Sequence, residues 1–240
     1  MAKTVVVLGA RNLGGAIIDH FVELGWNAAG VARSDDTLKC VEQRGAHALS
    51  ADAANPESLG DALARARDKF GSVDAVINSV TASRSTGGPF GGGELAGADL
   101  NAFDAWTVAV AEQAFVFLST GIAALEQNEG RGGTLVQITG GSSRRAMPGR
   151  GLWAAGAFAT RALVQAAAQE MRAGGIHVAL LVVDATIESP KTEAFTQGTP
   201  QGALAEMGEI ARAAAYLVEQ GVRAYTHEMV VTPAGERWVP

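Results

Sequence analysis

The sequence has little of what marks a metalloprotein or a protein stapled by disulfides. Among 240 residues there is one cysteine, Cys40, and the four histidines stand singly along the chain. A lone cysteine forms neither a disulfide framework nor a cysteine-based metal site, so we predict no bound metal. The formal net charge of -6 also disfavours a nucleic-acid-binding surface, because such surfaces are basic.

Long apolar runs are missing as well. No run of about 18 apolar residues occurs, so we predict no membrane span. The first residues, MAKTVVVLGA, lead straight into a strand pattern without the layout of a signal peptide, so we expect a cytoplasmic protein. The chain is 48% hydrophobic and contains 30 glycines. This composition suits a single α/β domain over residues 1–240.

The beginning of the chain has the layout of a dinucleotide-binding unit. Thr4–Leu8 is predicted as a strand, a turn from Gly9 to Gly15 follows, and the next residues have helical spacing. Glycines let the backbone approach a pyrophosphate, and free N–H groups at a helix start bind its charge. The plain alternative is a turn that only brings the helix close to the strand.

The second predicted strand indicates which nucleotide would bind. Asn27–Ala32 ends in Arg33 and Ser34 rather than in an acid. An acid there would bind the ribose hydroxyls of NAD, whereas an arginine can receive the 2′-phosphate of NADP. Arg11 in the glycine turn adds a second guanidinium, so the pair favours NADP(H) over NAD(H); the alternative is two solvated arginines. Ser34 is also expected to cap the next helix.

The most informative stretch is Thr134–Gln169. Its apolar start, Thr134–Thr139, has the length and β-branched content of a buried strand. A Gly/Ser/Arg/Pro loop, Gly140–Gly151, follows, and an alanine-rich segment without a breaker after Gly156 is predicted as a helix. Ligands bind where such strands end.

This stretch and the glycine turn resemble the short-chain dehydrogenase/reductase family, and the resemblance covers nearly the whole chain. In that family the strand end carries a serine and the helix begins with Tyr-x-x-x-Lys. Here the serine position is Gly140, the tyrosine position Trp153 and the lysine position Ala157. A catalytic asparagine of the preceding helix aligns with Ala111. The resemblance therefore implies that no standard catalytic side chain is present.

The same resemblance implies the fold and the cofactor site. The fold would be a Rossmann-type doubly wound, mostly parallel seven-stranded sheet with helices on both faces. The family's Gly-x-x-x-Gly-x-Gly motif is matched at Gly9 and Gly15, with Leu13 in the middle position. The implied cofactor-binding residues are Gly9, Arg11, Asn12, Leu13, Gly15, Arg33, Ser34, Asp52, Ala53, Asn78, Ser79, Ile187 and Ser189.

Some of these positions have specific roles in the family. Asp52 and Ala53 match an Asp-hydrophobic pair that meets the adenine, and Asn78 keeps the first residue of an Asn-Asn-Ala-Gly tetrapeptide. A turn or cap role is the alternative for Asp52. Ile187, through its backbone, and Ser189, through its hydroxyl, stand where the family holds the nicotinamide amide.

Groups near the changed catalytic positions are candidates for substrate contacts. Ser142 and Arg144 follow Gly140 and could supply an unusual proton donor, or the arginine could hold an anionic substrate; solvated loop residues are the alternative. Trp153 either fills the emptied pocket or offers a stacking platform to a ring. Asp184 replaces a family proline at a strand end, either as a functional acid or as a loop cap.

Two further segments and three functions remain open. The glycine-rich segment 82–98 is either a substrate cover or a surface excursion, and Pro190–Gln201 is expected to form a lid-like loop. The chain is either an NADP(H)-binding protein without standard redox catalysis, an oxidoreductase for a carbonyl or alcohol with an unusual donor, or a non-redox lyase or cyclase. The first function requires that no tyrosine or lysine from elsewhere, such as Tyr216 or Lys191, faces the nicotinamide. By resemblance, the helix over residues 153–170 is expected to form a homodimer or homotetramer, and the small-molecule ligand is unknown.

Overall fold

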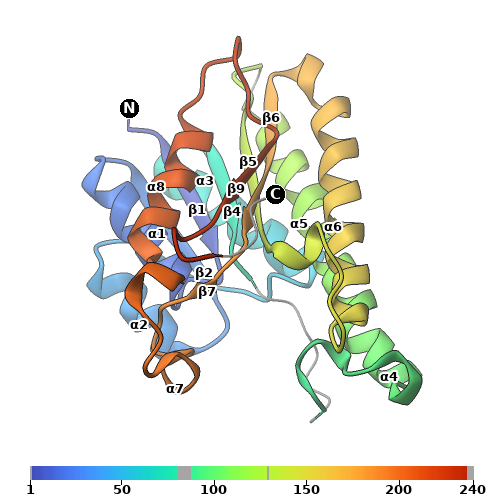
Figure 1. Cartoon of the computed structure of the whole chain (residues 1–240). Coiled ribbons are helices and arrows are strands. Elements are labelled where there is room, and N and C mark those ends of the chain that lie inside the picture. The colour runs from blue at the N-terminus through green and yellow to red at the C-terminus, as the bar shows by residue number, and fades with distance from the viewer. Residues whose placement is uncertain (1, 81–87, 129, 237–240) are drawn as a thin grey trace.

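The structure, a computed structural model, describes residues 2–80, 88–128 and 130–236 (Figure 1). One sheet of seven parallel strands has the order β3-β2-β1-β4-β5-β6-β9. The strands are β1 (Thr4–Leu8), β2 (Asn27–Ala32), β3 (His47–Ser50), β4 (Ala75–Asn78), β5 (Gly133–Gly140), β6 (Ile176–Val183) and β9 (Glu228–Val231).

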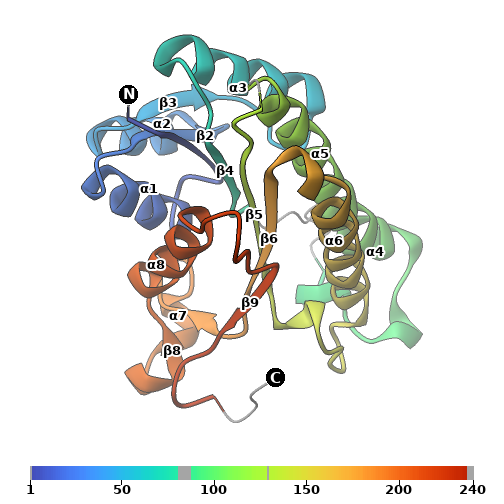
Figure 2. The ribbon, with the colours of Figure 1, turned by 90° about the horizontal axis from the view of Figure 1, so that it is seen from above.

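Helices cover both faces of this sheet (Figure 2). Helices α1, α2 and α8 pack on one face around a core that includes Phe21, and α3, α5 and α6 pack on the other around Phe117. The helices are α1 (Leu13–Glu23), α2 (Asp35–Gln43), α3 (Pro56–Phe70), α4 (Leu100–Phe103), α5 (Ala109–Glu126), α6 (Gly151–Glu170), α7 (Glu193–Thr196) and α8 (Met207–Val218). The predicted doubly wound fold with helices on both faces is confirmed.

The strands are apolar because both of their faces are covered. Every residue of β1 and β6 is buried, as expected of central strands in a parallel sheet. The strand order reverses between β1 and β4, which lie side by side. In doubly wound sheets ligands bind in the crevice at the carboxyl ends of the strands where the order reverses. The fold therefore directs attention to the residues that follow β1 and β4.

Apolar residues at helical spacing predict one long helix over residues 99–127. The structure interrupts it by a π-helical turn, Asp104–Val108, between α4 and α5. This turn lies against α6. A Cβ on Gly156 would be 2.8 Å from the carbonyl oxygen of Trp106, and the hydroxyl of Thr107 donates to the carbonyl of Leu152 over 2.8 Å. Helix α6 begins at Gly151, two residues before the predicted start at Trp153, and runs through Gly156. Sequence periodicity does not reveal such a contact between two helices.

Leu100–Glu126 is long and apolar enough to cross a membrane by length and composition alone. Half of its most apolar part is buried in the fold, and Phe117 and Leu125 of α5 belong to the core under the sheet. A core helix passes the same test of length and composition, and the burial favours that interpretation here.

The two predicted loop segments both project at the lower end of the molecule in Figure 1, where α4 and α7 lie. Residues 81–87 of the glycine-rich segment lie outside the described residues, and the rest forms two short 3-10 turns, Phe90–Gly92 and Leu95–Gly97. The expected lid-like loop contains α7. It is enclosed by a small parallel pair of strands, β7 (Thr186–Ile187) and β8 (Leu204–Ala205).

Candidate functional site

The turn after β1 brings α1 very close to the strand. Gly9 has a left-handed backbone (φ +82°), and a Cβ on Gly14 would be 2.4 Å from the Gly9 carbonyl oxygen and 2.8 Å from the Ser79 hydroxyl. The three atoms nearest to a Cβ on Gly15 all belong to the flexible side chain of Arg44, at 3.1–3.2 Å. The glycine spacing set by the structure is therefore Gly9-x-x-x-x-Gly14, one residue different from the expected match at Gly9 and Gly15.

The start of α1 carries groups suited to an anion. Leu13 is the first helical residue and packs, partly buried, against the core beneath α1. Asn12, the N-cap residue, makes no capping hydrogen bond, and the first turn holds no acidic side chain. Arg11 is exposed and forms no ion pair with a residue in the described ranges. Free N–H groups and an unpaired arginine next to them suit a phosphate.

The end of β2 holds the second arginine of the expected nucleotide site. Arg33 Nη1 lies 3.7 Å from Asp52 Oδ2, and both side chains are well exposed. Asp52 also accepts the backbone N–H two residues further on, at 3.0 Å, as in an Asx turn, and Ala53 beside it is buried. Ser34 Oγ accepts the N–H of Thr37 over 3.4 Å and so caps α2, as predicted.

A buried amide network fills the end of β4. Asn78 is fully buried, and its Nδ2 donates to Gln113 Oε1 (2.9 Å) and Gln137 Oε1 (2.8 Å). Its Oδ1 accepts the N–H of Val80 (3.1 Å) and Gln113 Nε2 (3.3 Å). The amide that α5 directs at the strand ends thus comes from Gln113, two residues beyond Ala111, where the expected alignment placed the asparagine position.

Ser79 ties the ends of β4 and β1 together. Its hydroxyl donates to the carbonyl of Leu8 over 2.8 Å and lies 3.2 Å from the carbonyl of Gly9. Its backbone N–H also donates to Leu8, at 3.0 Å. Ser79 therefore fixes the glycine turn to the neighbouring strand, and a direct ligand contact is not needed to explain it.

The residues expected at the nicotinamide end bond to each other. Thr192 donates its hydroxyl to the carbonyl of Ile187 (2.5 Å), and that hydroxyl is 3.0 Å from the hydroxyl of Ser189. The N–H of Ser189 also donates to Thr192, at 3.0 Å. These bonds shape the turn between β7 and α7, a role that the sequence pattern alone did not suggest.

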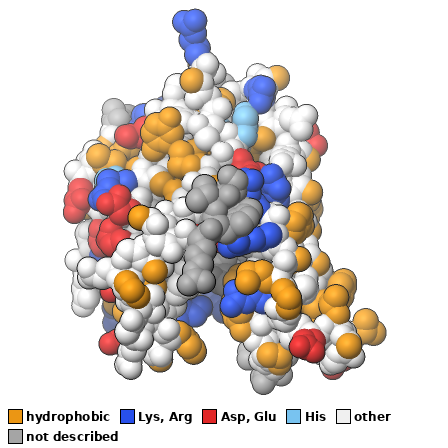
Figure 3. Space-filling view, viewed as in Figure 1, with side chains coloured by type: hydrophobic (Ala, Val, Ile, Leu, Met, Phe, Trp, Pro, Cys, Tyr) orange, Lys and Arg blue, Asp and Glu red, His pale blue; other side chains and the backbone are white. Residues whose placement is uncertain are grey.

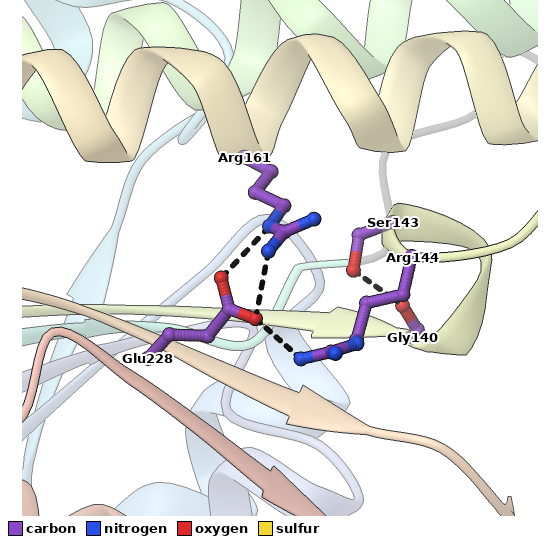
Figure 4. Close-up of polar contacts among 5 residues, drawn as sticks. All are labelled: Gly140, Ser143, Arg144, Arg161 and Glu228. Carbon is purple, nitrogen blue, oxygen red and sulfur yellow. Dashed lines mark hydrogen bonds and ion pairs between the residues drawn. The ribbon is translucent and has the colours of Figure 1, made fainter. Parts of the chain in front are cut away.

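The position that matches the family serine has room for a side chain. A Cβ on Gly140 would have one heavy atom within 4 Å, the carbonyl oxygen of Val183 at 3.9 Å. Ser143, three residues on, is fully buried and donates its hydroxyl to the Gly140 carbonyl over 2.9 Å (Figure 4). Ser142 is partly exposed, and its hydroxyl makes no hydrogen bond within the described part of the chain.

Arg144 is taken up by an ion-pair network, so the predicted role in holding substrate or donating a proton does not fit its geometry. Its Nη1 lies 2.6 Å from Oε1 of Glu228 on β9. The other oxygen of Glu228 accepts Arg161 Nε at 2.7 Å, and Arg161 Nη2 reaches Oε1 at 3.1 Å. Figure 4 shows both arginines converging on the one carboxylate from the loop and from α6. The network anchors the loop after β5 to β9.

Asp184, at the end of β6, is buried beside the same loop. Its Oδ1 accepts Arg145 Nη2 over 3.2 Å, and Oδ2 has no hydrogen-bond partner among the residues described. The carboxylate lies directly on Gly141, where a Cβ would be 1.9 Å from Oδ1. Asp184 therefore requires a glycine at 141 and acts as a charged contact between β6 and the loop after β5.

Trp153 belongs to an aromatic cluster at the start of α6. Its ring is 4.3 Å from that of Phe90, edge to face at 87°, and 5.9 Å from that of Trp106. Phe90 also meets Trp106 at 5.1 Å. Ala157, one turn further along α6, is buried at the lysine position. Trp153, predicted to match the family tyrosine, thus packs within an aromatic surface.

Neither tyrosine of the chain lies at the start of α6, whereas Lys191 lies in the turn that holds Ser189, at the expected nicotinamide end. Tyr216 is on α8, 57% exposed, and α8 packs on α1 across the sheet from α6. Tyr225 stacks on His177, near the start of β6 and so at the opposite edge of the sheet from the strand ends. Lys191 is exposed in the turn before α7.

Comparison with known proteins agrees with this geometry. A profile of the short chain dehydrogenase family matches residues 3–197. The farnesol dehydrogenase of Aedes aegypti is 22% identical over 248 residues, with 98% of each chain covered.

Solved structures show the same fold. An alcohol dehydrogenase of Thermococcus sibiricus, complexed with 5-hydroxy-NADP, is 21% identical with a TM-score of 0.79, and all of both chains is covered. A 3-ketoacyl-(acyl-carrier-protein) reductase of Brucella melitensis, complexed with NADH, is 19% identical with a TM-score of 0.81 and 97% of each chain covered. The family profile spans most of the sheet and the strand ends described above, and this chain belongs to the short chain dehydrogenase family.

Proposed function

We propose that the protein binds NADP(H) in the crevice between the ends of β1 and β4 and does not carry out the redox reaction standard for its family. One observation carries the proposal. The close approach of Gly14 to Gly9 preserves the glycine turn and leaves the start of α1 without a side-chain cap, as a phosphate site requires. By contrast, the positions that match the catalytic serine, tyrosine and lysine hold Gly140, Trp153 and Ala157.

The preference for NADP(H) rests on charge at the adenosine end. Arg11 has no ion-pair partner among the described residues, and β2 ends without an acid. The pair of Arg33 with Asp52 is exposed and long, and such surface pairs contribute little. A 2′-phosphate offers both arginines a stronger, charge-assisted partner than Asp52 offers one of them. One structural neighbour is complexed with an NADP derivative and another with NADH, so the fold is compatible with either nucleotide.

The loss of catalysis follows from proton supply. A bound nicotinamide would provide the hydride, but the oxygen of a carbonyl substrate must also be protonated or stabilised. The Trp153 indole N–H can donate a hydrogen bond, yet it does not act as an acid near neutral pH. General acid catalysis is worth roughly 10²–10⁴-fold and one oxyanion donor about 10²–10³-fold. The described residues can still contribute to the reaction rate by holding the cofactor and a substrate in position.

Isothermal titration with NADPH and NADH tests the binding proposal. We expect NADPH to bind about tenfold or more tightly than NADH, since the 2′-phosphate adds charge-assisted hydrogen bonds. Arg11→Gln should reduce that ratio, and Arg223→Gln, an exposed arginine at the opposite edge of the sheet, should leave it unchanged. Failure of both nucleotides to bind would overturn the proposal, and equal affinities would remove the preference for NADPH.

Restoring the family residues tests the catalytic part. Gly140→Ser fits without a close contact, because the nearest atom to its Cβ is 3.9 Å away. Combined with Trp153→Tyr and Ala157→Lys, it should raise NADPH consumption with a carbonyl panel by about 10²-fold or more. A wild-type rate already comparable with that of the restored variant would contradict the loss of standard catalysis.

A second function has one observation in its favour. The Ser142 hydroxyl is partly exposed beside Gly140 and makes no hydrogen bond to a described residue, so it is available as an unusual donor. The named relatives are dehydrogenases and a reductase. If the protein is an oxidoreductase of this kind, Ser142→Ala should lower its turnover at least tenfold, and unchanged turnover would exclude Ser142. Arg144 is not a candidate because Glu228 holds it. No observation favours a lyase or cyclase.

We also propose that two copies associate through α5 and α6. Phe115 on α5 and Phe158 on α6 remain exposed, and Ala155, Ala162 and Ala166 on α6 are exposed as well. Small residues allow close approach of helices, and exposed phenylalanines favour burial in an interface. A homodimer or homotetramer would cover this face.

A further inference from the structure

The segment after β4 is clamped onto the start of α6 by a close backbone approach. Gly91 has φ +82°, and a Cβ there would be 3.0–3.2 Å from the side chain and backbone of Arg150. Gly93 forms a parallel bridge with Arg150, and a Cβ on Gly92 would be 2.8 Å from Leu152. This approach places Phe90, which precedes the glycines, against Trp153 of α6.

The clamp leaves an aromatic surface open to solvent. Phe90 meets Trp153 at 4.3 Å and Trp106 at 5.1 Å, yet it remains 52% exposed. Leu95 lies over Gly151 and is also exposed. Figure 3 shows apolar side chains gathered at the lower right of the molecule, where Figure 1 labels α4, below a group of basic side chains. Exposed apolar patches of this kind are typical of interaction surfaces.

Arg150 supplies the charge at the edge of this surface. Its guanidinium carbon is 5.4 Å from the centre of the Phe90 ring, and no carboxylate of a described residue pairs with it. The neighbouring arginines differ, because Glu228 binds Arg144 and Asp184 binds Arg145. The first turn of α6, which follows Arg150, holds no acidic side chain. Among the described arginines of this region, Arg150 is therefore the one that an anion can reach without breaking an ion pair.

We propose that the ligand held beside the nucleotide is a flat aromatic molecule that carries a carboxylate. This inference rests on the proposed function, since it names the ligand class of the same site. The ring packs on Phe90 and Trp153, whose faces prefer offset or edge-to-face partners. The carboxylate pairs with the fork of N–H donors on Arg150, a geometry that guanidinium groups favour. A neutral ring lacks the second contact, and an aliphatic acid lacks the first.

Calorimetric titration of the protein with 2-naphthoate, in saturating NADPH, tests the ligand class. The comparison ligands are 2-naphthamide, which keeps the ring without the charge, and octanoate, which keeps the charge without the ring. We expect 2-naphthoate to bind at least tenfold more tightly than either. Arg150→Gln should weaken 2-naphthoate about tenfold and leave 2-naphthamide unchanged, and Arg223→Gln serves as the matched control. Phe90→Leu should weaken both ring ligands, and Tyr216→Leu, on the exposed face of α8, should weaken neither.

Each outcome bears on one part of the inference. Binding of NADPH without any binding of 2-naphthoate overturns the inference and leaves the nucleotide site standing. Equal affinity for 2-naphthamide, or no effect of Arg150→Gln, overturns the carboxylate; equal affinity for octanoate overturns the ring. If NADPH itself does not bind, the proposed function fails, and titration of the nucleotide-free protein decides the ligand class by the same comparisons.

Discussion

Replacing Asn78 by alanine should be among the most damaging changes at the end of β4. The side chain is fully buried and joins β4 to Gln113 of α5 and Gln137 of β5. Alanine removes two donated bonds, to the two glutamine oxygens, and two accepted bonds, from Gln113 Nε2 and the N–H of Val80. The alanine methyl group replaces none of them.

The magnitude follows from the groups left without partners. A buried polar group that loses its partner costs about 1–3 kcal/mol. Four such groups would give roughly 4–12 kcal/mol, but Gln113 and Gln137 can rotate toward each other, and a water can enter the space left by the amide. We therefore expect the free energy of unfolding to fall by about 3–5 kcal/mol. NADPH affinity should fall too, because Val80 and the strand end shape the crevice.

Urea denaturation, followed by circular dichroism, measures the change. The control is Asn27→Ala, whose one side-chain bond is 3.4 Å long and lies at the surface; it should change stability by less than about 0.5 kcal/mol. A double-mutant cycle with Gln113→Ala should show a coupling of about 1 kcal/mol or more between the two amides. If Asn78→Ala lost no more stability than the control, or if the two changes were additive, the network would not hold the site together.

Three further outcomes are expected. Gly14→Ala places a Cβ 2.4 Å from the Gly9 carbonyl oxygen and should abolish NADPH binding in calorimetry, whereas Gly15→Ala should retain it; equal losses would argue against Gly14 as the contact glycine. Burial lowers the pKa of His177 from its ordinary value, so the folded protein resists a proton that the unfolded chain accepts. The contribution of neutral His177 to the free energy of unfolding should therefore be fully present above about pH 6.5 and be lost as the pH falls below it. His177→Gln should flatten this pH dependence in urea titrations from pH 7.5 to 5. Phe158→Glu should shift the assembly toward monomers in analytical ultracentrifugation, and an unchanged sedimentation coefficient would exclude the α6 face.

Several strands of this fold could be predicted from the sequence because they are short apolar runs. β1 and β2 match the predicted bounds, and β5 extends the predicted Thr134–Thr139 by one residue at each end. The interruption between α4 and α5 could not be predicted, since it depends on the contact of Gly156 with two carbonyl groups of another helix. Apolar periodicity continues through such a turn and so predicts one helix.

The candidate site was harder to predict because several of its groups are defined by distant partners. Arg144 looks like a free loop arginine until Glu228, 84 residues later, is brought to it by the pairing of β9 with β6. The glycine turn also could not be predicted fully from the sequence. Matching the spacing of the family motif identifies Gly15 as the last motif glycine, whereas the close approach to Gly9 shows that Gly14 is the position with no room for a side chain. Ser34, in contrast, was predictable as a cap because capping depends on neighbours three residues away.

The changed positions at the strand ends depend on one another. Asp184 fits only because residue 141 has no side chain, and its charge is met by Arg145. Asp184 Oδ2 is buried and has no hydrogen-bond partner among the described residues, which lowers the stability of the folded chain. A proline or a small neutral residue at position 184 would avoid that cost. Costs of this kind are typically found where a site needs the group. The region around Gly140 is thus held in place by contacts that depend on one another, from Asp184 to Arg145 and from Arg144 to Glu228.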